Sequence, residues 1–326
     1  MKASSLSSHT QVPPVNTEER LEVQQMICSL IDKHASGQRK ATALRNEYAI
    51  ELIRYLNEEG MAKIFIKAFC QGLKSPLISE VREFFRTHSE ITNIICAQAG
   101  DPLAFEFLYH MRQPANPIDR YFINCKAGHQ IYVRLRKIIQ YLPGLIRKIY
   151  YSEKRTILVD NIGSGPGHDM IGVLLENPDL RPIVHVRNID VDENALKIGE
   201  GAAIRHTMKH NFLFVNQDFL KVDSREADLV LLIGFLCPVD LRRSRIILKK
   251  LKRFSRQDGH CLFSTVQTEM GQGDPVTDFI MRFSGWQMDY KNHEQVRNLC
   301  LESGWQPVDH FYDELGYNQM TLAKLL

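Results

Sequence analysis

The chain has 326 residues, of which 44% are hydrophobic and 24% charged, and its formal net charge is +3. This composition is ordinary for a globular protein, the length favours two domains, and a charge so close to balance does not indicate a polyanionic partner such as a nucleic acid. Because no apolar run is long enough to span a bilayer and residues 1–11 lack the apolar segment of a secretory signal, we expect a cytoplasmic protein without a membrane partner.

The N-terminal part is predicted to be helical. Residues 1–16 are rich in serine and contain a Pro-Pro pair, which predicts a disordered tail. From 17 to 151 the apolar residues recur at helical spacing, which predicts an all-α domain that shapes a substrate site. Within it, residues 116–122 are a candidate lid. Arg120 would then bind a carboxylate, although a surface ion pair explains this residue equally well.

From residue 152 to 326 short apolar runs alternate with helical stretches, which predicts a parallel sheet with right-handed crossovers. The predicted strands are 157–162, 183–189, 212–215, 228–233 and 260–266, and the predicted helices include 170–176, 193–206 and 241–254. Two further strand-like runs, 305–312 and 319–325, are separated by Glu314-Leu-Gly316 and predict a closing antiparallel hairpin.

A glycine-rich turn follows the first predicted strand, in the order Gly163-Ser-Gly165-Pro-Gly167. Glycine lets the main chain approach a ligand and adopt a positive φ, and Pro166 suits the first turn of a helix. The helix start would then offer free N–H groups to an anionic group. A tight turn without a ligand is the alternative interpretation.

The spacing of these glycines distinguishes between two kinds of nucleotide ligand. A dinucleotide fingerprint has glycines at positions one, three and six, but the sixth position here is His168. The G-x-G-x-G spacing instead resembles motif I of the class I S-adenosylmethionine-dependent methyltransferases. Further segments resemble the same family in order over about residues 155–326. The resemblance implies a Rossmann-like seven-stranded α/β sheet that binds S-adenosylmethionine.

The resemblance also implies which residues bind the cofactor. They are Asn161, Gly163, Ser164, Gly165, Gly167, Asp190, Val191, Asp218, Phe219, Gly234 and Phe235. Asp190 closes the second strand, where the family uses an acidic residue to accept both ribose hydroxyls; a helix N-cap is its alternative role. Asp218 and Phe219 would meet the adenine, or form a surface turn. Asn161 stands where the family usually has an acidic residue, and Asp160, one position earlier, points to the other face of the strand.

Little in the sequence identifies catalytic residues, because a sulfonium cofactor is its own electrophile and the protein mainly aligns the acceptor. Residues 268–290, with Trp286, are expected to form one wall of the substrate pocket. We predict methyl transfer to a small-molecule acceptor. The alternatives are aminocarboxypropyl transfer from the same cofactor, as in nicotianamine-synthase-like proteins, a non-catalytic scaffold, and an RNA methyltransferase.

The cysteines, one pair of histidines and one basic helix are not expected to belong to a functional site. The seven cysteines are scattered without a C-x-x-C pair, which indicates reduced thiols, Cys237 among them, and argues against structural zinc. His206 and His210 have the spacing of a metal pair, but no third ligand is near, so no metal is expected. The basic helix predicted at 241–254 is interpreted as a solvated face, with RNA contact as the alternative.

Overall fold

The computed structural model describes residues 46–224 and 226–326. The predicted tail at 1–16 and the start of the predicted helical domain lie outside these ranges. The helices up to the first strand are α2 (Asn46–Glu58), α3 (Ala62–Gln71), η1 (Gly72–Lys74), α4 (Ile78–His88), α5 (Glu90–Ala97), α6 (Pro102–Leu108), α7 (Pro117–Asn124) and α8 (Lys126–Glu153). The later helices are α9 (His168–Glu176), η2 (Pro178–Ile183), α10 (Glu193–Arg205), η3 (Lys209–Asn211), η4 (Phe219–Lys221), α11 (Leu241–Leu251), α12 (Thr268–Gly273), α13 (Pro275–Phe283) and α14 (His293–Glu302).

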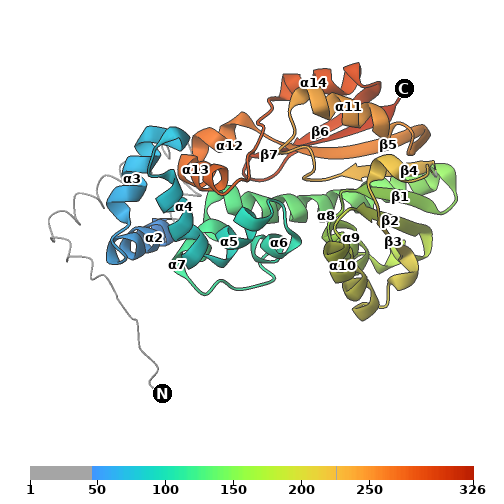
Figure 1. Ribbon diagram of the computed structural model, residues 1–326. Helices are drawn as coiled ribbons and strands as arrows, with labels where there is room; N and C mark the ends of the chain where they lie inside the picture. The colour runs from blue at the N-terminus through green and yellow to red at the C-terminus, as the bar shows by residue number, and fades with distance from the viewer. Residues whose placement is uncertain (1–45, 225) are drawn as a thin grey trace.

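Seven strands form one mixed sheet in the order β3-β2-β1-β4-β5-β7-β6 (Figure 1). The strands are β1 (Ile157–Ile162), β2 (Val184–Asp190), β3 (Phe212–Asn216), β4 (Ala227–Leu232), β5 (Ser255–Val266), β6 (Trp305–Tyr312) and β7 (Asn318–Leu325). The first five run parallel, and β7 lies antiparallel between β5 and β6. The predicted fold class, with its closing antiparallel hairpin, is confirmed.

The helix predicted to run to residue 254 ends earlier, at Leu251. The reason is the pairing of the next segment with the sheet. The N–H of Ala227 donates to the carbonyl of Phe254 at 2.7 Å, and Ser255 pairs with Ala227 in the register of β4 and β5. The chain therefore leaves the helix to begin β5 five residues before the predicted start of that strand.

Helices cover both faces of the sheet (Figure 1). Along β4, Leu229 and Leu231 pack against α8, α9 and α10, whereas Val230 and Leu232 face α11 and α14. This alternation follows from the two-residue period of a strand, and burial on both faces explains why β4 is continuously apolar.

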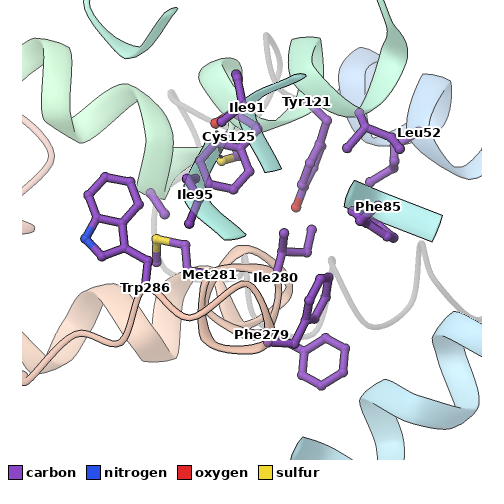
Figure 2. Close-up of a cluster of buried hydrophobic side chains, with 14 of the residues drawn as sticks. Leu52, Phe85, Ile91, Ile95, Tyr121, Cys125, Phe279, Ile280, Met281 and Trp286 are labelled. Atoms are coloured by element: carbon purple, nitrogen blue, oxygen red, sulfur yellow. Dashed lines mark hydrogen bonds between the residues drawn. The ribbon is translucent and has the colours of Figure 1, made fainter. Parts of the chain in front are cut away.

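The helical region is built from two parts of the sequence. Phe85 of α4, Ile91 of α5 and Tyr121 of α7 belong to the same core as Ile280 of α13, which follows β5 in sequence, and Figure 2 shows Tyr121 pointing toward Ile280. Helix α8 joins this region to the sheet, because Ile131 belongs to the helical core and Leu135 to the core under the sheet. The predicted domain division at residue 151 falls in the last turn of α8.

No helix in the described part of the chain is long and apolar enough to cross a membrane.

Candidate functional site

A cavity of about 680 Å³ lies at the carboxyl ends of β1, β2 and β4. One wall comes from the loops after these strands, and the opposite wall comes from α8, from residues 98–109 and from residues 285–287. In parallel α/β sheets ligands bind beyond the carboxyl ends of the strands, at the point where the strand order reverses. Here that point is β1, whose neighbours are β2 on one side and β4 on the other.

The glycine-rich turn forms the centre of the strand-side wall. Gly163, Gly165 and Gly167 all have positive φ, at 59°, 52° and 72°. A Cβ on Gly163 would lie 2.2 Å from the ring of Phe235, so packing requires glycine there. A Cβ on Gly165 would meet no protein atom within 4 Å, although this residue lines the cavity. The main chain at Gly165 is thus the part of the turn that is most open to a ligand.

Asp190 lies on the same wall beside the turn. Its Oδ2 accepts a hydrogen bond from the N–H of Gly165 at 2.7 Å, and its Oδ1 accepts one from the N–H of Asp192 at 2.9 Å. The N-cap of α10 is Asp192, whose side chain accepts from two N–H groups of that helix. The alternative role of Asp190 as the N-cap is therefore excluded, and its carboxylate borders the cavity with the exposed Val191.

The structure separates the predicted cofactor-binding residues into two groups. Those that line the cavity are Gly163, Ser164, Gly165, Asp190, Val191, Gly234 and Phe235. Those that do not line it are Asn161, Gly167, Asp218 and Phe219. The Asp218 side chain caps η4 by accepting from the N–H of Leu220 at 2.9 Å, and the Phe219 ring meets the edge of Phe235 at 5.9 Å.

Asn161 positions a carboxylate that is not predicted from the sequence to belong to the site. Its buried side chain donates to Asp169 Oδ1 at 2.9 Å and to Asn188 Oδ1 at 3.2 Å. Asp169 lies in the first turn of α9 and lines the cavity. Burial raises the pKa of Asp169, although hydrogen bonds from the Met170 N–H and from Asn161 oppose the rise. An acidic group thus reaches this wall from α9 instead of from position 161.

Three polar side chains reach the cavity from the residue after α6, from α8 and from the start of α9. The Arg134 guanidinium donates to the Tyr109 hydroxyl, and the Tyr109 ring packs edge-on against His168 at 5.8 Å. Burial raises the pKa of Tyr109. None of these three residues is predicted from the sequence to belong to the site. For His168, the sequence offers one signal, its position next to the glycine motif. For Arg134 it offers none, because no local pattern shows which face of α8 packs on the sheet.

The remaining wall is largely apolar and comes from the helical region. The rings of Phe105 and Trp286 meet edge to face at 5.7 Å, and Pro238 from the loop after β4 lies on the same cavity. The segment 268–290 therefore reaches the cavity through residues 285–287. The candidate lid at 116–122 does not line it, because α7 packs into the helical core and Arg120 forms an ion pair with Glu51.

A fully buried lysine fixes the loop after β4. Lys291 Nζ donates to the carbonyls of Leu236 and Val239, at 3.2 and 2.6 Å, and to the Asp289 carboxylate at 2.8 Å. These bonds satisfy all the donors of the ammonium group and neutralise its charge. They hold the segment that contributes Pro238 to the cavity, so Lys291 positions this wall without touching the cavity itself.

The titration of His168 gives a testable pH dependence. Burial lowers its pKa from 6.5 to about 4, so between these values the unfolded chain binds a proton that the folded protein does not. The free energy of unfolding must then fall as the pH falls. From pH 7 to pH 5 we expect His168 to account for a loss of about 2 kcal/mol. Urea unfolding of wild type and His168→Gln at both pH values measures this difference, and equal losses would contradict it.

The other features noted in the sequence do not line the cavity. Cys237 is buried, which raises the pKa of its thiol, and the cysteines in the described ranges form no disulfide bond. His206 and His210 are exposed, and the described residues contain no cluster of metal ligands. On α11, Arg245 forms an ion pair with Glu302 of α14.

The chain matches no protein-family model and no curated protein sequence. It is similar to solved structures. A possible exported protein from Bordetella parapertussis is 15% identical, with 94% of this chain and 96% of that chain covered and a TM-score of 0.56. Magnesium protoporphyrin IX methyltransferase from Synechocystis, with bound S-adenosylmethionine, is 12% identical, with 76% of this chain and 97% of that chain covered and a TM-score of 0.50.

These identities are too low to show more than the fold. A second structure of the Synechocystis enzyme, with bound S-adenosylhomocysteine, is similar over 76% of this chain and 99% of that chain, again at a TM-score of 0.50. The chain therefore has the Rossmann-like, seven-stranded fold of class I methyltransferases. The alignment with the Bordetella protein covers nearly the whole chain.

Proposed function

We propose that the protein is an S-adenosylmethionine-dependent methyltransferase that acts on a small-molecule acceptor. The observation that carries the proposal is the cavity, on which the open main chain at Gly165 and the carboxylate of Asp190 lie side by side. The fold adds support, because the Synechocystis enzyme with the same fold binds S-adenosylmethionine.

The residues of the cavity fit such a cofactor. Asp190 offers carboxylate oxygens that accept hydrogen bonds from ribose hydroxyls. Two buried nitrogen atoms, Arg134 Nε and His168 Nε2, have no hydrogen-bond partner among the described residues although both side chains line the cavity. Buried polar atoms without partners are uncommon in folded proteins, and these two side chains belong to the lining that a polar ligand would contact.

The chain's own contribution to methyl transfer is alignment and exclusion of water. Bound S-adenosylmethionine supplies an electrophilic methyl group. Phe105 and Trp286 present an apolar wall that excludes water and orients an acceptor. The cavity volume falls within the range of about 300–1,000 Å³ that is typical of small-molecule sites, which favours a small acceptor over a polymer.

Calorimetry and product analysis test this function. We expect the full chain to bind S-adenosylhomocysteine with 1:1 stoichiometry, and turnover to yield S-adenosylhomocysteine as the product derived from the cofactor. Methylthioadenosine as the product would contradict methyl transfer and support aminocarboxypropyl transfer. Absence of S-adenosylhomocysteine binding would favour a scaffold, and steeply salt-dependent RNA binding would favour an RNA substrate.

A further inference from the structure

Arg134 is a buried cation without a paired carboxylate in the described part of the chain. Its side chain comes from the middle of α8, and the residue is 5% exposed. The guanidinium donates to the Tyr109 hydroxyl, and Nη1 lies 3.9 Å from the Cys237 sulfur, whereas Nε has no partner among the described residues. Asp169 and Asp313 lie close enough to act on its charge, but neither forms an ion pair with the guanidinium. A buried charge is costly unless a hydrogen-bonded partner of opposite charge compensates it, so this arrangement favours an anion in direct contact.

The cavity is the place from which such an anion can reach Arg134. Arg134 lines it, and Nη2 lies 3.1 Å from the position that a Cβ on Gly234 would occupy, at the end of β4. Asp190 stands at the end of β2. Because β1 lies between β2 and β4, Arg134 and Asp190 flank the glycine turn from opposite sides. A ligand along the turn therefore meets a carboxylate at one end and a guanidinium at the other.

A second charged group, Asp169, lies beside Arg134 and limits the kind of ligand that this end of the cavity can bind. Asp169 lines the same cavity and lies close enough to Arg134 for their charges to interact. Of the described lining residues, Arg134 alone carries a permanent positive charge. A guanidinium next to a carboxylate complements the two charges of an α-amino acid, whose carboxylate pairs with arginine through strong charge-assisted hydrogen bonds.

We infer that Arg134 and Tyr109 form a carboxylate-binding subsite at the β4 end of the cavity. This inference rests on the proposed function for its ligand. The carboxylate comes either from the amino-acid end of the cofactor or from an acidic acceptor, and Asp169 favours the cofactor because it complements the neighbouring ammonium group. The role of Arg134 is to position the ligand and to supply the charge that neutralises it.

Calorimetry with two ligands separates this role from a structural one. S-adenosylhomocysteine carries the amino-acid group, whereas methylthioadenosine shares its nucleoside and sulfur but lacks that group. We expect Arg134→Gln to weaken S-adenosylhomocysteine binding at least about 10-fold and methylthioadenosine binding less than about 2-fold. Arg134→Lys, which keeps the charge, should fall between. Arg136→Gln is the matched control, since Arg136 lies on the same helix but pairs with Glu176 at the surface.

Each outcome decides between the alternatives. Equal losses for both ligands would show a structural role for Arg134 and overturn the subsite. If Arg134→Gln leaves S-adenosylhomocysteine binding unchanged, benzoate and acetate are titrated into the protein saturated with that ligand. Binding of either acid by wild type and its loss in Arg134→Gln assigns the subsite to the acceptor; no difference overturns it.

If Arg134→Gln does not fold, the subsite is tested by changing the ligand instead of the protein. Wild type is titrated with S-adenosylhomocysteine and with its decarboxylated analogue, and we expect the analogue to bind at least about 10-fold more weakly. Equal affinities would remove the cofactor as the source of the carboxylate. Failure of wild type to bind S-adenosylhomocysteine at all would instead contradict the proposed function, so the two failures are distinguishable.

Discussion

Gly165→Val should leave the protein folded and weaken S-adenosylhomocysteine binding by about 10- to 100-fold. A Cβ at this position meets no protein atom within 4 Å, so the cavity has room for an added side chain. It projects where the proposed ligand needs bare main chain, and overpacking of this kind costs about 1–3 kcal/mol of binding free energy. Calorimetry measures the affinity, and thermal unfolding measures the stability.

The positive φ of Gly165 adds a stability cost of about 1–2 kcal/mol that must be separated from the loss of binding. Gly316→Val is the matched control. Gly316 has a φ of 71°, meets no atom within 4 Å of a built Cβ, and lies in the turn between β6 and β7. We expect it to lose a similar amount of stability and to keep its affinity. A folded Gly165→Val protein with wild-type affinity would contradict the assignment of this turn to a cofactor.

The sheet was predictable because its signals are local. The apolar run 157–162 coincides with β1, and 305–312 coincides with β6, since each is bounded by turn residues that end the strand. The glycine spacing predicted the turn after β1, and Asp190 followed from its place at the end of β2. Site residues that stand immediately after a strand are predictable from the sequence, because the carboxyl ends of parallel strands share one edge of the sheet.

The opposite wall of the cavity was not predictable in the same way. Arg134 belongs to a basic stretch of α8, and its position toward the cavity depends on how a 28-residue helix packs at once on the sheet and on the helical core. The helical periodicity shows that α8 has an apolar face. It does not show which turns of α8 pack on the sheet and which pack on the helical core. Residues 285–287 meet Phe105 only because α12 and α13 return to the N-terminal helices, a contact between segments about 180 residues apart.

Asp160 and Asn161 are neighbours in β1, but their side chains lie on opposite faces of the sheet and have different roles. Asp160 is fully buried and pairs with Arg187 of β2, with Oδ1 3.0 Å from Nε and Oδ2 2.6 Å from Nη2. Asn161 points to the other face of β1, toward Asp169 and the cavity. Alternation along the strand thus gives the carboxylate a structural partner and leaves the amide to position the site.

Asp160→Asn should therefore lower the free energy of unfolding by about 3–5 kcal/mol, because it leaves the buried Arg187 guanidinium without its counter-charge. Urea unfolding measures the loss.

The double variant Asp160→Leu/Arg187→Met removes both charges and should recover most of the stability, since well-packed apolar residues replace buried ion pairs at little cost. The folded fraction of each variant should bind S-adenosylhomocysteine as wild type does. A loss below about 1 kcal/mol for Asp160→Asn would mean that Arg187 finds another counter-charge or water, and that the pair contributes little to the fold.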